Sequence, residues 1–552
     1  MTPRTDRRPT RVAAVGAAVL LLAGCSAGTR PDEDGEGRGG SYELTTMTPA
    51  PTSEIDHVTW NVFQGEPQTI DPFRSADYSP NMINANMCES LLSQTPEFTV
   101  EPNLAASFDN PDPLHWVYDL REDVTFWNGE PMTAEDVAFS LERNLTDPTS
   151  FYHYLYENVE SVEVSGEHQV TVALTEPDYL FHDELSSFAG VVVDQEFFEE
   201  NEDAFGSPDT GVMCTGPFRF HTWEQGESIT VRRYDDYWNE DLRPRAAEVE
   251  FTFLTDDSAI TSGLLSGQID GTYTVPTSGY GQLAASDVGT LSHGPAPLSV
   301  SLLYTDPEGP MSDPSLRRAL QMAIDWEGIG AEAYSGTARP TPLQTPPSVF
   351  GFAESELAGL VEAMPAPASG EVDQASELVA ALPGEVRGET VTMVVPETTD
   401  AQQLGLSVKD AADRIGLDFD LQVVPGDVYT NYLYDPRTRE GVDVLYTQFW
   451  PNVPNPLDWM GATAVSGGIF NLYGYEGVDE LFQEARSLAD PDERAGLLVE
   501  MEGRLHDDLL PMTPGLEVDN TVWMNDRVTG APAAFAYVFH PWAAYLGGTE
   551  TE

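Results

Sequence analysis

The pattern that most constrains this chain is a pair of short apolar runs followed by a strong helix signal. The runs, residues 116–120 and 124–127, predict β-strands, and Asn128-Gly129 after them predicts a tight turn. Thr133 predicts the N-cap of a helix, with Asp136 three residues later as its capping-box partner. Apolar residues then recur every four positions on that helix (Val137, Leu141 and Leu145). Strands and amphipathic helices that alternate in this way predict a mixed α/β fold.

Two more helices are predicted in the second half of the chain. Asp313 predicts an N-cap, and Pro314 suits the first helical position, where its missing N–H needs no partner. A further amphipathic helix is predicted around residues 492–508. With 552 residues the chain is long enough for two or more lobes. The sequence has no short internal repeat that would favour a solenoid.

The N-terminus carries the most specific short signal. An apolar run over residues 12–22 is shorter than the ~20 residues that a membrane-spanning helix needs, but it suits an export signal. The run ends in Leu22-Ala23-Gly24-Cys25, which resembles a bacterial lipobox. Residues 1–24 are therefore predicted to be a lipoprotein signal peptide and Cys25 the lipidated residue; the alternative is a plain signal peptide with a chance cysteine. Residues 25–56, rich in Gly, Ser, Thr, Pro and acid, predict a flexible tether. Four arginines form the basic head of the signal (Arg4, Arg7, Arg8 and Arg11).

The chain is strongly acidic. It has 92 acidic and 26 basic residues, a formal net charge of −66, and Lys409 is its only lysine. Such a surface repels phosphate backbones, so nucleic acid is excluded as a partner. This charge is typical of a surface solvated in a salty or extracellular medium, and attraction of cationic solutes is the functional alternative.

Apart from Cys25, the chain has two cysteines, Cys88 and Cys214. In an oxidising compartment they are predicted to form a disulfide, with two separate buried thiols as the alternative. Their spacing does not decide between these, because it does not tell how far apart their Cα atoms lie.

Motifs of enzymes are missing from the sequence. It contains no G-x-S-x-G, H-E-x-x-H or C-x-x-C, and Lys409 follows Val408 rather than the glycine of a P-loop. The nine histidines show no spacing typical of metal ligands. We therefore expect no catalytic residue, no metal site and no cofactor.

The segment of residues 118–140, with its strand and helix signals, resembles the signature of family 5 of the extracellular solute-binding proteins, the dipeptide-, oligopeptide- and nickel-binding group. The resemblance rests on residues 118–121 (YDLR), 124–129 (VTFWNG) and 131–140 (PMTAEDVAFS). Asn128 stands where Asp is more usual. Further matching segments follow in the expected order: 67–72, 89–92, 102–105, 215–218, 236–238, 265–270, 317–320, 323–325, Asn471, Tyr475 and 478–479.

The resemblance implies an architecture as well as a function. It implies a two-lobed clamp with mixed sheets and a hinge, of the type II-like periplasmic-binding-protein class in its large peptide-binding variant. Lobe I is expected to span residues 57–297 plus 521–552, and lobe II residues 298–520. A hinge of this kind absorbs the closing motion in a few residues.

The resemblance also implies where a solute would bind. In the peptide-binding relatives a carboxylate of the second lobe pairs with the α-amino group of the ligand, and Asn452 stands at the matching position here. Asn is neutral, so the charge-assisted hydrogen bond to an ammonium is lost. Either another acid such as Asp443 or Asp458 takes the role, or the ligand is not a free-amino peptide. The other candidate ligand residues are Asp77, Tyr78, Tyr273, Phe449, Trp450 and Trp459.

The resemblance finally implies partners and location. We expect a monomer, anchored by lipid on the extracellular face of the cell membrane, that delivers a peptide or peptide-like solute to ABC transporter permease subunits. An oligosaccharide, opine-like molecule or metal chelate is the alternative ligand class. A secreted hydrolase or an adhesin is a remote alternative.

Overall fold

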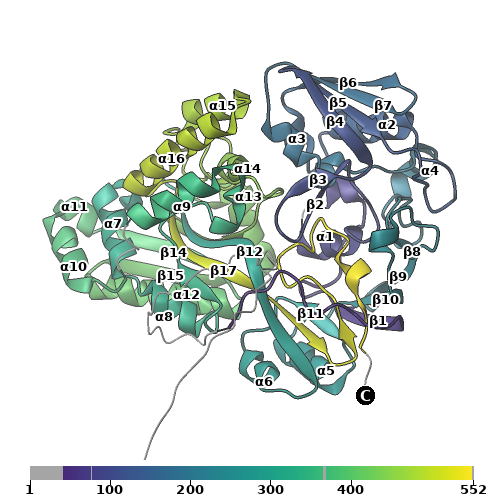
Figure 1. Ribbon diagram of the computed structural model, residues 1–552. Helices are drawn as coiled ribbons and strands as arrows, with labels where there is room; N and C mark the ends of the chain where they lie inside the picture. Colours follow the sequence, from purple (N-terminus) through teal and green to yellow (C-terminus); the bar gives the residue numbers. More distant parts are fainter. Residues whose placement is uncertain (1–41, 76, 365–368, 550–552) are drawn as a thin grey trace, which may run out of the picture. The chain divides into compact units, whose positions relative to one another are not determined.

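Figure 1 shows the computed structural model, which describes residues 42–75, 77–364 and 369–549. The largest sheet has eleven strands, in the order β15-β14-β16-β12-β17-β11-β1-β10-β9-β8, with β13 paired to β17 beside this path. Their bounds are β1 Ile55–Asn61, β8 Phe218–Glu224, β9 Ser228–Arg233, β10 Ala246–Thr252, β11 Gly271–Tyr273, β12 Gly289–Tyr304, β13 Ala338–Pro340, β14 Thr390–Pro396, β15 Asp418–Val424, β16 Val444–Phe449 and β17 Met512–Asn525. Parallel and antiparallel pairs both occur in it, so the sheet is mixed.

Two long strands, β12 and β17, form the middle of this sheet. They pair antiparallel from Gly289 opposite Asn525 to Leu303 opposite Met512, with a register shift between Gly294 and Leu298. Every residue of β17 is buried. The lobe boundaries expected after residues 297 and 520 fall inside these two strands, so both expected lobes contribute to one sheet.

A second sheet has the order β4-β5-β7-β6. Its strands are β4 Ala105–Asp112, β5 His115–Leu120, β6 Val159–Gly166 and β7 Gln169–Leu174. Helix α2 (Ala134–Thr146) packs against β6 and β7. Thr133 and Asp136 form the predicted capping box, and Val137 and Leu141 are fully buried. The amphipathic helix thus lies where its pattern predicts it.

The run 124–127 is not a strand, which corrects the prediction. Only an isolated bridge joins Thr125 to Pro131. The N–H of Phe126 instead donates to the Glu130 carbonyl at 2.9 Å across the turn, where Gly129 alone takes a positive φ of 89°. The N–H of Trp127 donates to the Cys214 carbonyl at 3.3 Å. The turn and a distant loop therefore satisfy backbone groups that a ladder would otherwise use.

The remaining elements surround the two sheets (Figure 1). Asp313 caps α7 by accepting from the Ser315 N–H at 2.8 Å, as its sequence predicts. The helices are α1 Tyr78–Asn84, α3 Leu180–Glu184, α4 Gln195–Asn201, α5 Asp257–Ser266, α6 Tyr280–Ala284, α7 Pro314–Ala323, α8 Trp326–Glu332, α9 Glu354–Ala363, α10 Val372–Ala381, α11 Gly384–Arg387, α12 Thr399–Arg414, α13 Gly426–Tyr434, α14 Pro456–Thr463, α15 Asp479–Ser487 and α16 Pro491–Asp508. The short strands are β2 Leu92–Gln94, β3 Val100–Pro102, β18 Val528–Thr529 and β19 Gly547–Gly548. The 3-10 turns are η1 Pro72–Arg74, η2 His153–Tyr156, η3 Phe188–Gly190, η4 Glu202–Ala204, η5 Glu240–Leu242, η6 Pro310–Ser312, η7 Pro347–Val349, η8 Gly351–Ala353, η9 Pro436–Thr438 and η10 Trp542–Tyr545.

Part of the expected tether is folded against the body of the protein. Residues 42–54 pair with distant parts of the chain: the N–H of Thr45 donates to the His293 carbonyl at 2.9 Å, and that of Ser53 to the Gly548 carbonyl at 3.1 Å. The Tyr42 hydroxyl donates to the Asp519 carboxylate at 2.8 Å. Residues 42–54 are therefore held against the folded body, and the rest of the expected tether lies outside the described residues. The predicted signal peptide and Cys25 lie outside the described residues.

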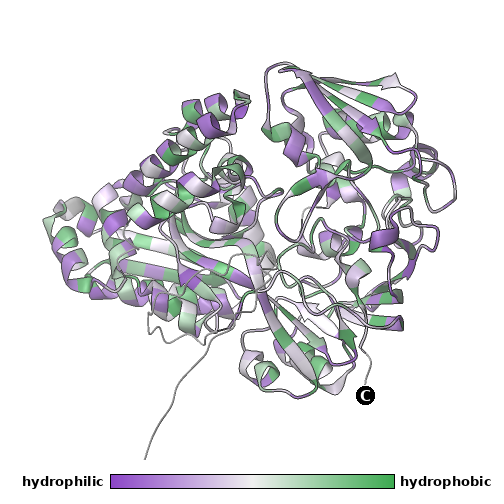
Figure 2. Cartoon of the chain, viewed as in Figure 1, coloured by the Kyte–Doolittle hydropathy of each residue, from purple (hydrophilic) through white to green (hydrophobic). Residues whose placement is uncertain are grey.

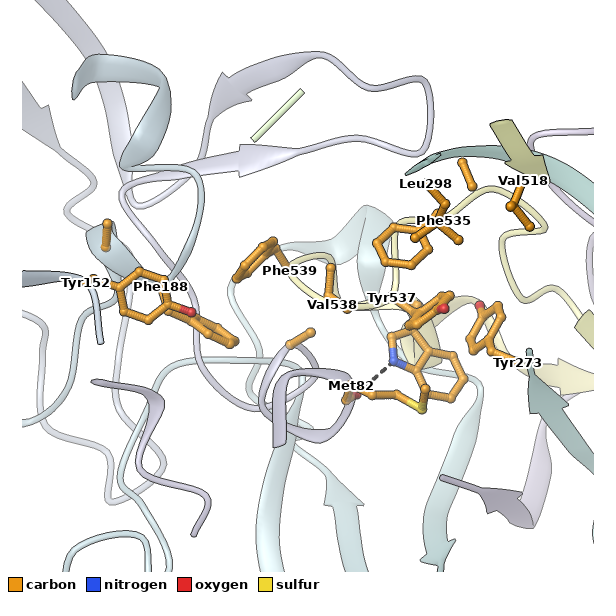
Figure 3. Close-up of a cluster of buried hydrophobic side chains, with 14 of the residues drawn as sticks. Met82, Tyr152, Phe188, Tyr273, Leu298, Val518, Phe535, Tyr537, Val538 and Phe539 are labelled. Atoms are coloured by element: carbon orange, nitrogen blue, oxygen red, sulfur yellow. Dashed lines mark hydrogen bonds between the residues drawn. The ribbon is translucent and has the colours of Figure 1, made fainter. Parts of the chain in front are cut away.

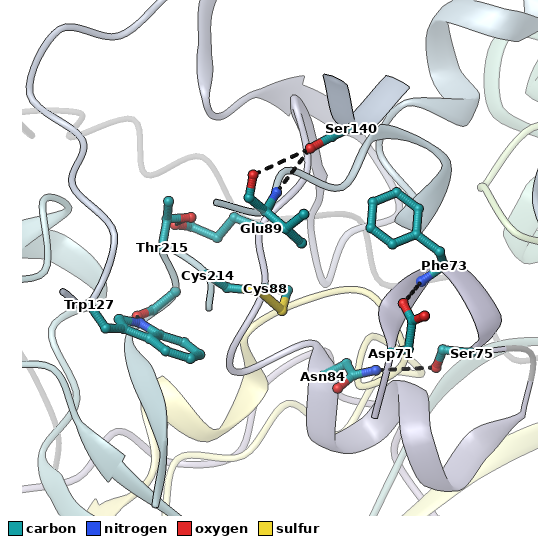
Figure 4. The surroundings of a disulfide bond; sticks show 12 residues. Asp71, Phe73, Ser75, Asn84, Cys88, Glu89, Trp127, Ser140, Cys214 and Thr215 are labelled. Carbon is teal, nitrogen blue, oxygen red and sulfur yellow. Dashed lines mark hydrogen bonds between the residues drawn. A yellow bond between two sulfur atoms is a disulfide. The ribbon is translucent and has the colours of Figure 1, made fainter. Parts of the chain in front are cut away.

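A disulfide joins Cys88 and Cys214, whose Cα atoms are 5.0 Å apart (Figure 4). Beside it, the N–H of Gly216 donates to the Met87 carbonyl at 2.9 Å. The carboxylate of Glu89 is fully buried and accepts from three side chains (Thr215 at 2.8 Å, Tyr237 at 2.8 Å and Trp238 at 3.1 Å). The disulfide therefore crosslinks two segments that hydrogen bonds also hold together.

Hydrophobic and hydrophilic residues alternate along the helices and strands, as Figure 2 shows. This is the pattern of elements that bury one face and expose the other. Among the described residues, no helix is both long enough and apolar enough to span a bilayer.

Candidate functional site

Five aromatic residues from three distant segments meet in what we call the aromatic cluster: Tyr78, Trp450, Phe535, Tyr537 and Phe539. Tyr78 is the first residue of α1, Trp450 follows β16, and the other three lie after β18. The ring centroids of Tyr78 and Trp450 are 5.4 Å apart, and Trp450 lies 5.8 Å from Phe535 and 5.7 Å from Phe539. These spacings are those of favourable edge-to-face or tilted aromatic pairs.

The members of the aromatic cluster differ in exposure. Phe535, Tyr537 and Phe539 are buried, and Figure 3 shows them among other core side chains. Tyr78 and Trp450 are only partly buried. The three residues of the C-terminal segment therefore form a base, and Tyr78 and Trp450 keep part of their apolar surface accessible.

Two predicted ligand residues lie behind this surface. Tyr273 is 0% exposed, stacks on Tyr537 at 4.0 Å and donates its hydroxyl to the Pro532 carbonyl at 3.0 Å. Trp459 is 1% exposed, and its ring lies 4.9 Å from that of Phe449, which is partly buried. Neither Tyr273 nor Trp459 offers surface to a solute in this structure, and both pack behind the residues that do.

Asn452 lies two residues beyond Trp450, in the loop between β16 and α14. Its side-chain amide donates to the Tyr154 hydroxyl at 2.7 Å, and its backbone carbonyl accepts from the Gln94 side-chain amide at 2.6 Å. Tyr154 is 51% exposed, and the side chains of tyrosine and asparagine are both uncharged at neutral pH. The Asn452–Tyr154 pair is therefore neutral and offers no counter-ion to an ammonium group.

The two acids considered as substitutes for that carboxylate are both engaged elsewhere. Asp443 directly precedes β16, while Trp450 directly follows it, so the strand separates them by about 23 Å at ~3.3 Å per residue. The Asp443 carboxylate accepts from the Thr392 N–H at 2.8 Å. Asp458 is buried in α14 and accepts from the Val453 N–H at 3.1 Å. Neither offers a free carboxylate beside the aromatic cluster.

Asp77 directly precedes Tyr78 and is exposed. Within the described part of the chain, its carboxylate has no side-chain hydrogen bond or ion pair, and it does not cap α1. Desolvation raises its pKa, so the ionised form is poorly stabilised by its surroundings. The charge of Asp77 adds to the effect of burial in raising the pKa of the Tyr434 hydroxyl at the end of α13. An accessible carboxylate without a counter-ion favours binding of a cationic group beside it.

Sequence reasoning missed several residues of this region. Phe535, Tyr537 and Phe539 form an alternating aromatic pattern in the sequence, which is a visible signal for one face of an extended segment. Tyr154 and Tyr434 have no such local signal, because their surroundings come from distant segments. Tyr154 is hydrogen-bonded to Asn452, 298 residues away, and Tyr434 is affected by the charge of Asp77.

A separate cavity of about 600 Å³ lies between η1, α2 and α4. It is lined by residues that include Arg74, Arg143 and Phe198, and by none of the predicted ligand residues. In the described residues, no group of three or more His, Cys, Asp or Glu side chains could hold a metal ion.

Comparison with known proteins identifies relatives of this chain. The family model "Bacterial extracellular solute-binding proteins, family 5 Middle" matches residues 99–471. The glutathione-binding protein GsiB of Salmonella typhimurium is 24% identical over 289 residues, which are 52% of this chain and 56% of that protein. The chain thus aligns with about half the length of the curated relatives that it matches.

Solved structures show the same fold. The peptide-binding protein DppA of Helicobacter pylori, in complex with the peptide STSA, has a TM-score of 0.76 and 18% identity, covering 90% of this chain and 99% of DppA. AgaA of Agrobacterium tumefaciens R10, in complex with agropinic acid, has a TM-score of 0.74 and 20% identity, with coverage of 90% and 99%. The fold is therefore the predicted α/β fold of the two-lobed, type II-like periplasmic binding proteins.

Proposed function

The chain belongs to family 5 of the bacterial extracellular solute-binding proteins, and on this premise we propose that it captures a peptide or peptide-like solute for an ABC importer. Family membership makes it a binding protein of a transport system rather than an enzyme. In this proposal the captured solute is delivered to permease subunits, and ATP hydrolysis belongs to other subunits of the importer.

The observation that carries the binding site is the meeting of Tyr78 and Trp450 beside Asp77. Concave solute sites combine apolar walls with a few polar groups that fix orientation. Tyr78 and Trp450 supply accessible aromatic surface, and Asp77 an accessible carboxylate without a counter-ion. We propose that these three, with Phe449 and Asn452, contact the solute.

A non-peptide solute is the second candidate, and Asn452 favours it. The amide of Asn452 is neutral and already donates to Tyr154, so it cannot replace the carboxylate that pairs with a peptide's α-amino group in the peptide-binding relatives. Burying an ammonium without a counter-ion costs on the order of several kcal/mol. A free-amino peptide would therefore have to place its ammonium at Asp77 instead, whereas an opine-like molecule has no such requirement.

The solute class can be tested directly. Native mass spectrometry of the purified protein identifies any ligand it retains, and titration calorimetry then compares glutathione, the peptide STSA and agropinic acid. Binding of a peptide supports the first candidate, and binding of agropinic acid alone supports the second. No binding of these probes, together with retention of no solute, would contradict the proposed function.

Three variants locate the site. Trp450→Ala and Asp77→Asn are expected to weaken binding of whichever probe binds, the second most strongly for a cationic probe. Asn452→Asp is expected to strengthen binding of free-amino peptides. Asn239→Asp is a matched control, because an aspartate can keep the N-cap hydrogen bond that Asn239 accepts from the Asp241 N–H, and Asn239 is not a predicted ligand residue. Equal responses at Asn452 and Asn239 would place the site elsewhere.

We also propose that Cys25 is lipidated and holds the protein, as a monomer, on the extracellular face of the cell membrane. The support is the Leu22–Cys25 sequence after an apolar run. The test is the membrane fraction: Cys25→Ser should release the protein into the medium, and Cys88→Ser, which leaves the lipobox intact, should not. Release of both or of neither would contradict the anchor.

A further inference from the structure

A polar contact joins α3 and the segment before it to α14 and α15. The N–H of Tyr179 donates to the Arg486 carbonyl at 2.9 Å. Asp183 accepts from the Asn455 side-chain amide at 2.7 Å. Arg486 pairs with Asp178 at 2.6 Å, and its other terminal nitrogen lies 2.5 Å from Glu157. We call this set of interactions the α3 contact; it joins residues that sequence reasoning assigns to different lobes.

One carboxyl group in the α3 contact has no donor. Glu184 is 1% exposed, and no hydrogen-bond donor among the described residues reaches either of its oxygens. The carboxyl group that reaches it is that of Asp458, which is 4% exposed and whose Oδ2 accepts from the Val453 N–H at 3.1 Å. Two acceptor groups therefore face each other in a buried site.

The charges around this pair do not compensate it. Arg486 attracts Glu184, but both of its terminal nitrogens are engaged by Asp178 and Glu157. Asp178 adds a further negative charge near Glu184. Other titratable groups are also close. Arg494 attracts Asp183 and lies over the ring of Phe352, and His182, within α3 itself, stacks on Trp116 at 4.4 Å. The charge of Glu184 also acts on Tyr152 and Tyr154, and that of Asp458 on Tyr154.

We propose that Glu184 and Asp458 share one proton while the α3 contact is formed. A carboxylic acid donates to a carboxylate, so a single proton from solvent satisfies both groups and removes one buried negative charge. Without it, two ionised carboxylates would face each other away from water, an arrangement that raises one pKa of such a pair strongly. When α3 separates from α14, water reaches both groups and the proton leaves.

The electrostatics of each group agree with this sharing. Burial raises the pKa of Glu184 well above its usual value, and the charge of Asp458 raises it further. Burial also raises the pKa of Asp458. A carboxyl whose pKa is raised in the contact favours the contact at low pH, and this contribution is lost as the pH rises through the raised pKa. The α3 contact is therefore strengthened by acid.

Hydrogen exchange of the ligand-free, full-length mature protein tests the proposal. Protection in the peptides that contain Tyr179 and Val453, corrected for intrinsic exchange, gives the opening constant of the contact between pH 5 and 8. If opening releases one proton, that constant rises by up to about tenfold per pH unit below the raised pKa. Glu184→Gln replaces the shared proton by a permanent amide donor, so its opening constant should lose this rise with pH.

A matched variant and a second measurement complete the test of the shared proton. Glu196→Gln makes the same substitution at an exposed position of α4 and should keep the wild-type slope. Equal slopes in wild type and Glu184→Gln would overturn the proposal. If Glu184→Gln does not fold, infrared spectroscopy replaces it: the wild type at neutral pH should show the band of a buried protonated carboxyl, and Asp458→Asn should change it. A wild-type spectrum without such a band would equally overturn the proposal. None of these outcomes depends on which solute is captured.

Discussion

Replacing Arg486 by methionine removes the buried cation of the α3 contact while keeping most of the volume of its side chain. The Arg486 side chain is 8% exposed and that of Asp178 is 0% exposed. After the change, Asp178 keeps three donors, the N–H groups of Leu180 and Phe181 and the amide of Asn158, each at 3.1 Å. It loses its counter-ion, which leaves an uncompensated charge away from water.

The expected cost follows from that burial. Breaking a buried ion pair by removing one partner costs about 3–5 kcal/mol. The matched control is Arg504→Met: Arg504 pairs with Glu500 at 2.7 Å, but these side chains are 45% and 53% exposed. An exposed pair of this i,i+4 type contributes only ~0.3–0.5 kcal/mol. Arg486→Met should therefore lower the free energy of unfolding about ten times as much as Arg504→Met.

Denaturant unfolding of the two variants and the wild type measures these free energies. The charge argument is isolated by adding Asp178→Asn to Arg486→Met, since asparagine can keep the hydrogen bonds to the N–H groups of Leu180 and Phe181 and removes the unpaired charge. The double variant should recover at least half of the loss. Equal small losses at Arg486 and Arg504, or no recovery in the double variant, would refute the reasoning.

Three further predictions concern the first half of the chain. Cys88→Ser with Cys214→Ser opens a crosslink over a sequence separation of 126 residues and should lower the free energy of unfolding by about 5 kcal/mol, read from denaturant curves; an unchanged midpoint would contradict it. Burial lowers the pKa of His182 to about 4, so its contribution to stability is present above about pH 6.5 and is lost as the pH falls through about 4. His182→Phe keeps the stacking and should remove about 3 kcal/mol of acid sensitivity between pH 7 and 4, whereas equal sensitivity in both proteins would exclude His182 as its source. Thr133→Ala removes half of the capping box with Asp136 and should cost ~1 kcal/mol, seen as faster hydrogen exchange in the first turn of α2; unchanged exchange there would count against the cap.

Local signals in the sequence predicted local structure well. The caps at Thr133 and Asp313 are formed because a capping side chain and its N–H partners lie within three residues of each other. The strand prediction for residues 124–127 was wrong for a related reason. Its β-branched and aromatic residues suit a strand, but its backbone groups find partners at Glu130 and Cys214 instead.

The sequence did not predict features that depend on contacts between distant parts of the chain. Aromatic residues were good candidates for a solute site as a group, but sequence alone does not separate Trp450, which keeps accessible surface, from Trp459, which is buried. Residues 42–54 were predicted to belong to the tether, because nothing in their composition indicates partners such as Gly548, almost 500 residues away. Asp77 was a candidate by resemblance, and only the structure shows its carboxylate to be accessible and without a counter-ion.

The pairing of β17 has a consequence for the order in which this protein folds. β1 pairs with β11 and β11 with β17, so the last long strand connects β1 to β12 and to the strands that follow β12 in the sheet. During synthesis from the N-terminus, the edges of β11 and β12 that β17 covers must stay unpaired until residue 525 has emerged. Exposed strand edges are templates for pairing with other chains. We therefore expect nascent chains that end before Met512 to aggregate or to recruit chaperones, and chains that extend beyond Asn525 to do neither.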